Sequence, residues 1–269
     1  EALHDWGRAP ADRVASARAS VAALIGASPD EIVFTSGDVE SRNLAVKGTM
    51  SALAGRGDHI VASMMEHPAT LSACRSSTRR SGSLTLLPVD GLGAIAADDL
   101  RAALRPETVL VCLTHAQAEI GTIADLPPLV AAARTGDTHP TVHVDAALTA
   151  GLLDIDVATL GADLVTVGCA SIGGPPWIGA LWGGPQTRIH PLIEGGTQEH
   201  GKRGGSLDVP AVAGFGVAAE IAQATRRERV RTLRERAERL ASGLLTIDGV
   251  RLIGPPLDDE VLAADRGDV

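Results

Sequence analysis

The sequence predicts an α/β fold in which helices cover both faces of a mostly parallel β-sheet. Short runs rich in Val, Leu and Ile alternate with longer stretches of helical periodicity. Continuous apolar runs are typical of buried parallel strands, and strand–helix alternation is typical of a sheet covered on both faces. With 269 residues, of which 45% are hydrophobic, the chain is long enough to bury a substantial core.

The first expected element is a helix over residues 12–25, which Gly26 ends. Strands and helices then alternate. The expected strands cover residues 32–35, 60–63, 84–88, 109–114, 142–145, 164–167 and 178–182, and the expected intervening helices end near residues 54, 75, 104 and 133. Ligands of such sheets bind beyond the carboxyl ends of the strands. His67, His115, Asp145 and Ser171 all follow such ends and are therefore candidate site residues.

A long helix is expected over residues 209–245, where apolar residues recur at spacings of three and four and predict one packed face. Seven Arg and three Glu lie between residues 226 and 239. This pattern favours a solvated helix face, and a basic docking surface is the alternative. We divide the chain into a large α/β domain (residues 1–215) and a second part (residues 216–269). The second part contains most of the long helix and the start of a truncated or missing small C-terminal domain.

Composition narrows the classes of partner. The formal net charge of −9 argues against nucleic acid and against an anionic membrane. No stretch reaches membrane-spanning length, and we expect no signal peptide. The three cysteines (Cys74, Cys112 and Cys169) follow no disulfide or metal-binding spacing, which indicates a reducing compartment. A cytoplasmic location is therefore expected.

Several segments, taken in order, resemble the cysteine desulfurases, the class V branch of the fold-type I enzymes that use pyridoxal 5′-phosphate (PLP). They are EIVFTSGDVESRNLAVKG (31–48), HIVASMMEHPAT (59–70), THAQAEIGTIADL (114–126), TVHVDAALTAGLLDIDV (141–157), ADLVTVGCASIGGPPWIGAL (162–181) and EGGTQEHGKRGGSLDVPAVAGFG (194–216). The resemblance implies the large domain of these transferases and a homodimer, in which the last segment reaches the cofactor phosphate of the neighbouring subunit.

The resemblance also assigns site residues. His67 is implied to stack on the pyridine ring, Asp145 to pair with the pyridine nitrogen, and Ser206 to replace a threonine that contacts phosphate. Each has a structural alternative: Asp145 as a carboxylate that accepts from backbone N–H groups, His67 as a residue at a helix start, and Ser206 as part of a glycine-rich surface loop.

The chain departs from the family at the central position. Where the family has the lysine that holds PLP as a Schiff base, this chain has Ser171, which has no amine. Further departures remove hydrogen-bond donors or introduce negative charge near the phosphate: Asp38, Val39, Ala118, Leu148 and Gly168. We therefore expect no catalytic residue and no bound cofactor, and interpret His67, Asp145 and Ser206 as a relict PLP pocket.

The resulting hypothesis is a non-catalytic cysteine desulfurase homologue that acts as a binding, scaffold or regulatory protein, with a partner in sulfur transfer or biosynthesis. The alternative is an active PLP-dependent desulfurase or cysteine lyase that uses another amine, such as Lys202 reaching a partner's pocket, or segments outside this sequence. A metal site built from strand-end side chains is a minor third hypothesis. Its members would be Glu66, His67, His115, Glu119, His143 and Asp145.

Overall fold

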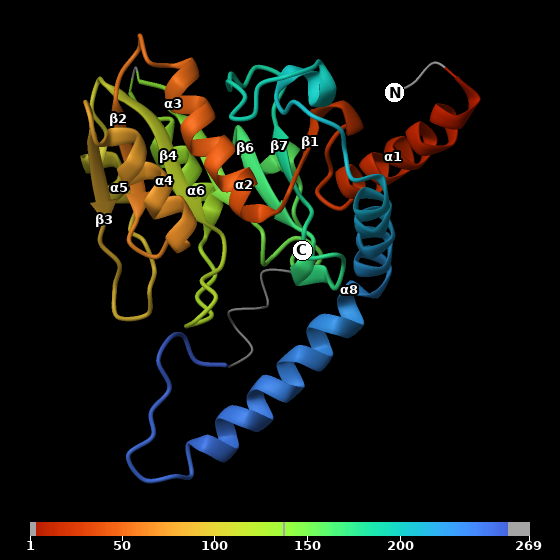
Figure 1. Cartoon of the computed structure of the whole chain (residues 1–269). Coiled ribbons are helices and arrows are strands. Elements are labelled where there is room, and N and C mark those ends of the chain that lie inside the picture. Colours follow the sequence, from red (N-terminus) through yellow and green to blue (C-terminus); the bar gives the residue numbers. More distant parts are fainter. Residues whose placement is uncertain (1–3, 137, 258–269) are drawn as a thin grey trace.

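The structure is a computed structural model that describes residues 4–136 and 138–257. Its centre is a seven-stranded sheet with the strand order β1-β7-β6-β5-β4-β2-β3 (Figure 1). The strands are β1 (Ile32–Thr35), β2 (His59–Ser63), β3 (Ser83–Leu87), β4 (Thr108–Thr114), β5 (Thr141–Asp145), β6 (Leu164–Gly168) and β7 (Gly179–Gly183).

One strand, β7, runs against the others. It pairs antiparallel with β1 and with β6, whereas β2, β3, β4, β5 and β6 form parallel pairs. The carboxyl ends of the five parallel-paired strands therefore meet at one edge of the sheet. The predicted mostly parallel sheet is confirmed.

Helices cover both faces of this sheet (Figure 1). They are α1 (Asp5–Ala23), α2 (Asp38–Asn43), α3 (Thr49–Ala52), α4 (Pro68–Thr78), α5 (Ala97–Ala103), α6 (Leu126–Ala133), α7 (Val157–Leu160) and α8 (Val209–Leu244). Alternate strand residues serve the two faces: Ile60 and Ala62 pack with the segment that contains α2 to α4, and Val61 packs in the larger core with α1, α5, α6 and α8. Such alternation is the period of two that buried strands impose.

The two terminal helices pack on each other. An added Cβ on Gly216 of α8 would lie 2.6 Å from the Cα of Ala17 on α1, so the helix backbones approach too closely for a larger side chain. Phe215, beside this contact, is fully buried and packs against Phe34 of β1. This contact fixes α1 and the first half of α8 on the sheet.

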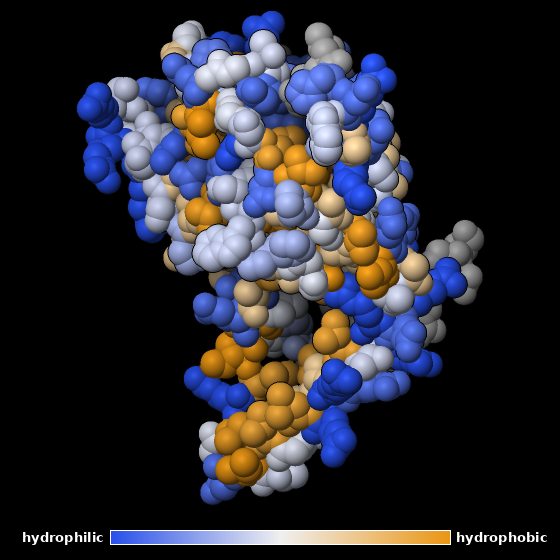
Figure 2. Space-filling model, turned by 45° about the vertical axis from the view of Figure 1, so that its right-hand side comes forward, coloured by the Kyte–Doolittle hydropathy of each residue, from blue (hydrophilic) through white to orange (hydrophobic). Residues whose placement is uncertain are grey.

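The second half of α8 leaves the core. The helix has its predicted extent, and its buried residues end at Ala222. Leu233, Leu240 and Leu244, which were predicted to form a packed face, are 49%, 64% and 44% exposed. That prediction is wrong for the described residues, because no other element of the described chain lies against this face. Figure 2 shows the resulting apolar surface at the lower end of the molecule.

The proposed domain boundary after residue 215 falls inside the continuous helix α8. The change from buried to exposed side chains comes about two turns later, beyond Ala222. Residues 258–269, the end of the proposed second part, lie outside the described residues. The two-part division stays a prediction.

Candidate functional site

The candidate site lies at the carboxyl ends of β4, β5 and β6. Asp145 is the last residue of β5 and stands between Thr114 of β4 and Thr166 of β6 in the sheet register. Ser171 follows β6 in a short 3₁₀ turn, Ala170–Ile172. The topology thus brings Asp145 and Ser171 to one edge, as the positions of these residues after strand ends predict.

An arginine from α2 dominates the electrostatics of this edge. The Nε atom of Arg42 donates to Asp145 Oδ2 at 2.5 Å, and an Nη atom donates to Oδ1 at 3.2 Å. The other Nη atom donates to Asp38 Oδ2 at 2.7 Å. The side chains of Arg42 and Asp145 are only 3% and 5% exposed, so this is a buried ion pair with an additional acid at its rim. Burial favours a neutral arginine, but Asp145 and Asp38 outweigh it and raise the pKa of Arg42.

A second acid, Glu66, is buried beside the pair. Its Oε2 accepts from the Thr114 hydroxyl at 3.0 Å, and its Oε1 has no hydrogen-bond partner among the described residues. Burial and the nearby charge of Asp145 raise the pKa of Glu66 to about 8. Glu66 is therefore mostly protonated at neutral pH, and the site does not carry its full negative charge.

His67 stands at the exposed rim and begins α4. Its Nδ1 accepts from the Ala69 N–H at 3.1 Å, which caps the helix. Partial burial, followed by the charge of Arg42, lowers the pKa of His67, and Asp145 and Asp38 act in the opposite sense. His67 therefore lies close enough to Arg42 and Asp145 to feel their charges, and its Nδ1 atom is already used to cap α4.

Ser171 is tied to the backbone. Its hydroxyl lies 2.5 Å from the carbonyl oxygen of Ala147 and 3.2 Å from that of Gly168, and both can only accept. The Ala147 carbonyl also crowds Gly168, where an added Cβ would lie 2.6 Å from its oxygen. A serine hydroxyl that donates to a carbonyl has no base to activate it. In this structure the side chain is held by these two backbone carbonyl groups.

Both lysines of the sequence, Lys47 and Lys202, lie at the other edge of the sheet. Lys47 lines a cavity of about 310 Å³ with Gly57 and Asp58, which directly precede β2. The Lys202 Nζ lies 4.0 Å from where a Cβ on Gly183 would be, and Gly183 pairs with Leu164 at the start of β6. The length of β6 separates that point from Gly168 by about 13 Å, at roughly 3.3 Å per residue. Within the described chain, neither lysine amine is at the edge that carries Asp145 and Ser171.

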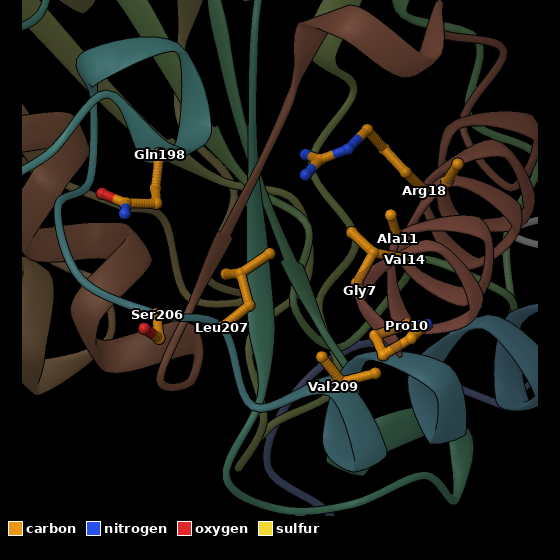
Figure 3. A pocket seen from close by; sticks show the side chains of 10 residues that line it. Gly7, Pro10, Ala11, Val14, Arg18, Gln198, Ser206, Leu207 and Val209 are labelled. Carbon is orange, nitrogen blue, oxygen red and sulfur yellow. The ribbon is translucent and has the colours of Figure 1, made fainter. Parts of the chain in front are cut away.

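Ser206 lies apart from the other predicted residues. It lines a cavity of about 350 Å³ between α1 and the segment that leads into α8, together with Arg18, Gln198 and Leu207 (Figure 3). Asp145, His67 and Ser171 do not line this cavity. The described chain therefore does not bring Ser206 to the strand ends that carry Asp145 and Ser171.

The loop that carries Ser206 is anchored by Glu199. Both carboxylate oxygens of Glu199 accept from the Arg18 guanidinium, at 2.6 and 2.9 Å, and Oε2 also accepts from the Phe34 N–H at 2.6 Å. Glu199 and His200 adopt φ values of +48° and +56°, which residues other than glycine rarely adopt. Further along, Arg203 pairs with Glu40 of α2 at 3.2 Å. These buried and partly buried contacts hold a strained turn in place.

The six side chains of the metal hypothesis do not converge. Among the described residues, no three His, Cys, Asp or Glu side chains are placed to hold a metal ion. The Nδ1 of His115 lies 2.9 Å from the Thr149 hydroxyl, and the Nε2 of His143 lies 2.9 Å from the Thr166 hydroxyl. Burial lowers the pKa of each histidine to about 4, so both are neutral at physiological pH.

Comparison with known proteins places the chain in a family. The family described as Aminotransferase class-V matches residues 1–263. The chain belongs to this family. Its relatives include the cysteine desulfurase IscS of Dictyoglomus turgidum, 41% identical over 220 residues that cover 82% of this chain and 55% of the relative. The cysteine desulfurase IscS of Acinetobacter baumannii (strain AYE) is 40% identical over 259 residues, 94% of this chain and 63% of the relative.

Solved structures of the family have the same fold. A structure titled as a NifS-like protein superimposes with a TM-score of 0.91 at 30% identity, covering 94% of this chain and 69% of that one. DndA from Streptomyces lividans gives a TM-score of 0.82 at 31% identity, covering 92% and 71%. The predicted fold class and the resemblance to the cysteine desulfurases are confirmed. The chain spans between 55% and 63% of the two curated relatives named above.

The residue of this site that the sequence analysis missed is Arg42. The sequence does contain a sign of this pairing. Arg42 follows Asp38 by four residues, so the two side chains lie on the same side of a helix whose flanking sequence is apolar. The partner Asp145 lies 103 positions further along the chain. No local pattern links residues so far apart.

Proposed function

We propose that this chain is a non-catalytic homologue of the cysteine desulfurases that does not hold PLP as a Schiff base. The observation that carries the proposal is the lack of a lysine amine, within the described residues, at the edge where Asp145 stands. Ser171 occupies the position of the family's lysine, and its hydroxyl is engaged with backbone carbonyls. A Schiff base needs a primary amine within bonding reach of the cofactor aldehyde, and these residues offer none. The residues present do not fit covalently held PLP.

The proposed role is that of a binding, scaffold or regulatory protein linked to sulfur transfer or biosynthesis. Its support is the membership of a family whose relatives are named cysteine desulfurases. A homodimer is part of the proposal. The contacts of Glu199 and Arg203 hold the loop that carries Ser206, and this loop lies away from Asp145 and Ser171 of the same chain, so that Ser206 is available to a neighbouring subunit. No helix among the described residues is long and apolar enough to cross a membrane. A cytoplasmic location belongs to the same proposal.

The test is a visible absorbance spectrum of the purified protein with added PLP, before and after borohydride reduction. We expect the spectrum of free PLP and no covalently trapped cofactor. A shifted visible band that reduction traps on the protein would refute the proposal. If Lys202→Ala then abolished that band, while Lys47→Ala kept it, the trapped amine would be Lys202 of a neighbouring subunit, and the chain would be an active PLP-binding member of its family.

A further inference from the structure

The ion pair between Arg42 and Asp145 affects what the site can bind, independently of Ser171. Arg42 is 2% exposed, so its guanidinium is held inside the protein at the end of β5. It meets both oxygens of the Asp145 carboxylate, at 2.5 and 3.2 Å. Paired guanidinium and carboxylate groups of this kind are strong and geometrically specific.

The hydrogen-bonding capacity of Asp145 is largely used within the chain. Its Oδ1 accepts from an Arg42 Nη atom and from the Ala147 N–H at 3.1 Å, which fills both lone-pair directions of that oxygen. Its Oδ2 accepts from Arg42 Nε. The negative charge of Asp145 is balanced by a cation that cannot lose its proton in a protein.

A protonated pyridine ring would bring a second positive charge to the same carboxylate. That charge would lie within a few ångströms of the guanidinium, and like charges at such distances in a buried site repel strongly. Asp38, which also pairs with Arg42, does not remove this repulsion, because its carboxylate lies at the more exposed side, 42% accessible. The ring nitrogen would have to displace Arg42 or remain unprotonated.

We propose that Arg42 is a specificity-determining residue that takes the place of the cofactor's ring nitrogen at Asp145 and so excludes PLP-like ligands that carry a positive ring. This inference extends the proposed function, which rests on Ser171 alone. Arg42, in addition to Ser171, then separates this chain from a PLP site. Restoring a lysine is then insufficient to restore the cofactor.

The experiment compares PLP binding by three variants: Ser171→Lys, Ser171→Lys with Arg42→Asn, and Ser171→Lys with Arg134→Gln. Arg134 pairs with Asp163 at the opposite edge of the sheet, which makes it a matched control for the loss of an arginine. The new lysine and the PLP aldehyde form a C=N bond with loss of one water, and the product is followed by visible absorbance and by borohydride trapping. We expect the Arg42→Asn variant to bind PLP at least about tenfold more tightly than the other two, because like-charge repulsion is removed.

A second measurement covers the case in which Arg42→Asn fails to fold. A PLP analogue with C–H in place of the ring nitrogen is titrated against Ser171→Lys, in which Arg42 is intact. We expect the analogue to bind more tightly than PLP. Tighter binding of PLP than of the analogue, or equal PLP affinity of all three variants, would overturn the inference. Either result overturns the inference and leaves the proposed function standing. Trapping of PLP by the unaltered protein would refute the proposed function and, because Arg42 is intact in that protein, would also contradict the inference.

Discussion

Replacement of Arg42 by glutamine tests the buried ion pair directly through stability. The change leaves Asp145 buried, at 5% exposure, without its counter-charge. Loss of one partner of a buried pair typically costs about 3–5 kcal/mol, because the remaining charge is no longer compensated. At roughly 2–4 °C per kcal/mol for a domain of this size, the melting temperature should fall by roughly 10 °C.

The assay is unfolding by urea and by heat of the unaltered protein and of Arg42→Gln, followed by far-UV circular dichroism at neutral pH. The double variant Arg42→Gln with Asp145→Asn removes both charges, and we expect it to recover at least half of the lost stability. Arg226→Gln serves as the control, because Arg226 pairs with the 67% exposed Asp154 and its loss should cost less than about 1 kcal/mol.

A loss below about 1 kcal/mol for Arg42→Gln would refute this reasoning, since an exposed pair costs that much. Failure of the double variant to recover stability would show that Arg42 acts through packing of its side chain and not through the charge of Asp145. Either result would also weaken the assignment of Arg42 as the internal partner of Asp145.

Three further predictions follow from other buried groups. Burial and the charge of Asp145 raise the pKa of Glu66 to about 8, so the folded protein retains a proton that the unfolded chain releases near pH 4.5. The contribution of Glu66 to the free energy of unfolding therefore falls as the pH rises from about 4.5 to 8. The free energy of unfolding of Glu66→Gln, measured with urea, should therefore rise relative to that of the unaltered protein by up to about 1.4 kcal/mol per pH unit over that range. Parallel pH profiles of the two proteins would contradict this. Glu199→Gln should loosen the strained turn, because Arg18 loses its buried charged partner, and trypsin should then cut after Lys202 or Arg203 faster than in the unaltered protein; an unchanged cleavage rate would argue that the turn is held by other contacts. Phe215→Ala should cost about 3–5 kcal/mol in urea unfolding, whereas Leu240→Ser on the exposed half of α8 should change stability by less than about 0.5 kcal/mol; similar losses for both would mean that the exposed face is covered in solution.

The sheet was predictable from the sequence because its strands are apolar runs between turns. The expected strand over residues 32–35 matches β1, and the other strands differ by about one residue at their ends. The first helix begins seven residues earlier than expected, at Asp5, because Pro10 is accommodated inside it. A proline inside a helix is normally unfavourable, so the residues before Pro10 carry no strong helix signal in the sequence.

The candidate site was only partly predictable. Asp145 and Ser171 follow strand ends, and parallel strands bring their carboxyl ends together, so their shared location follows from topology. The Arg42 pair and the Glu199 anchor depend on contacts between residues 103 and 181 positions apart. Periodicity reports local structure and carries no information about such pairs. For the same reason, apolar spacing in α8 predicted a packed face without showing that the described chain provides nothing to cover it.

The internal pairing of Asp145 also bears on how the protein is produced and maintained. A buried carboxylate whose counter-charge arrives with a small molecule leaves a newly folded chain incomplete until that molecule is supplied. Here the counter-charge arrives from α2 of the same polypeptide, so folding alone completes the interior. If the chain holds no PLP, as proposed, we expect the amount of folded protein in a cell to be independent of the supply of that cofactor.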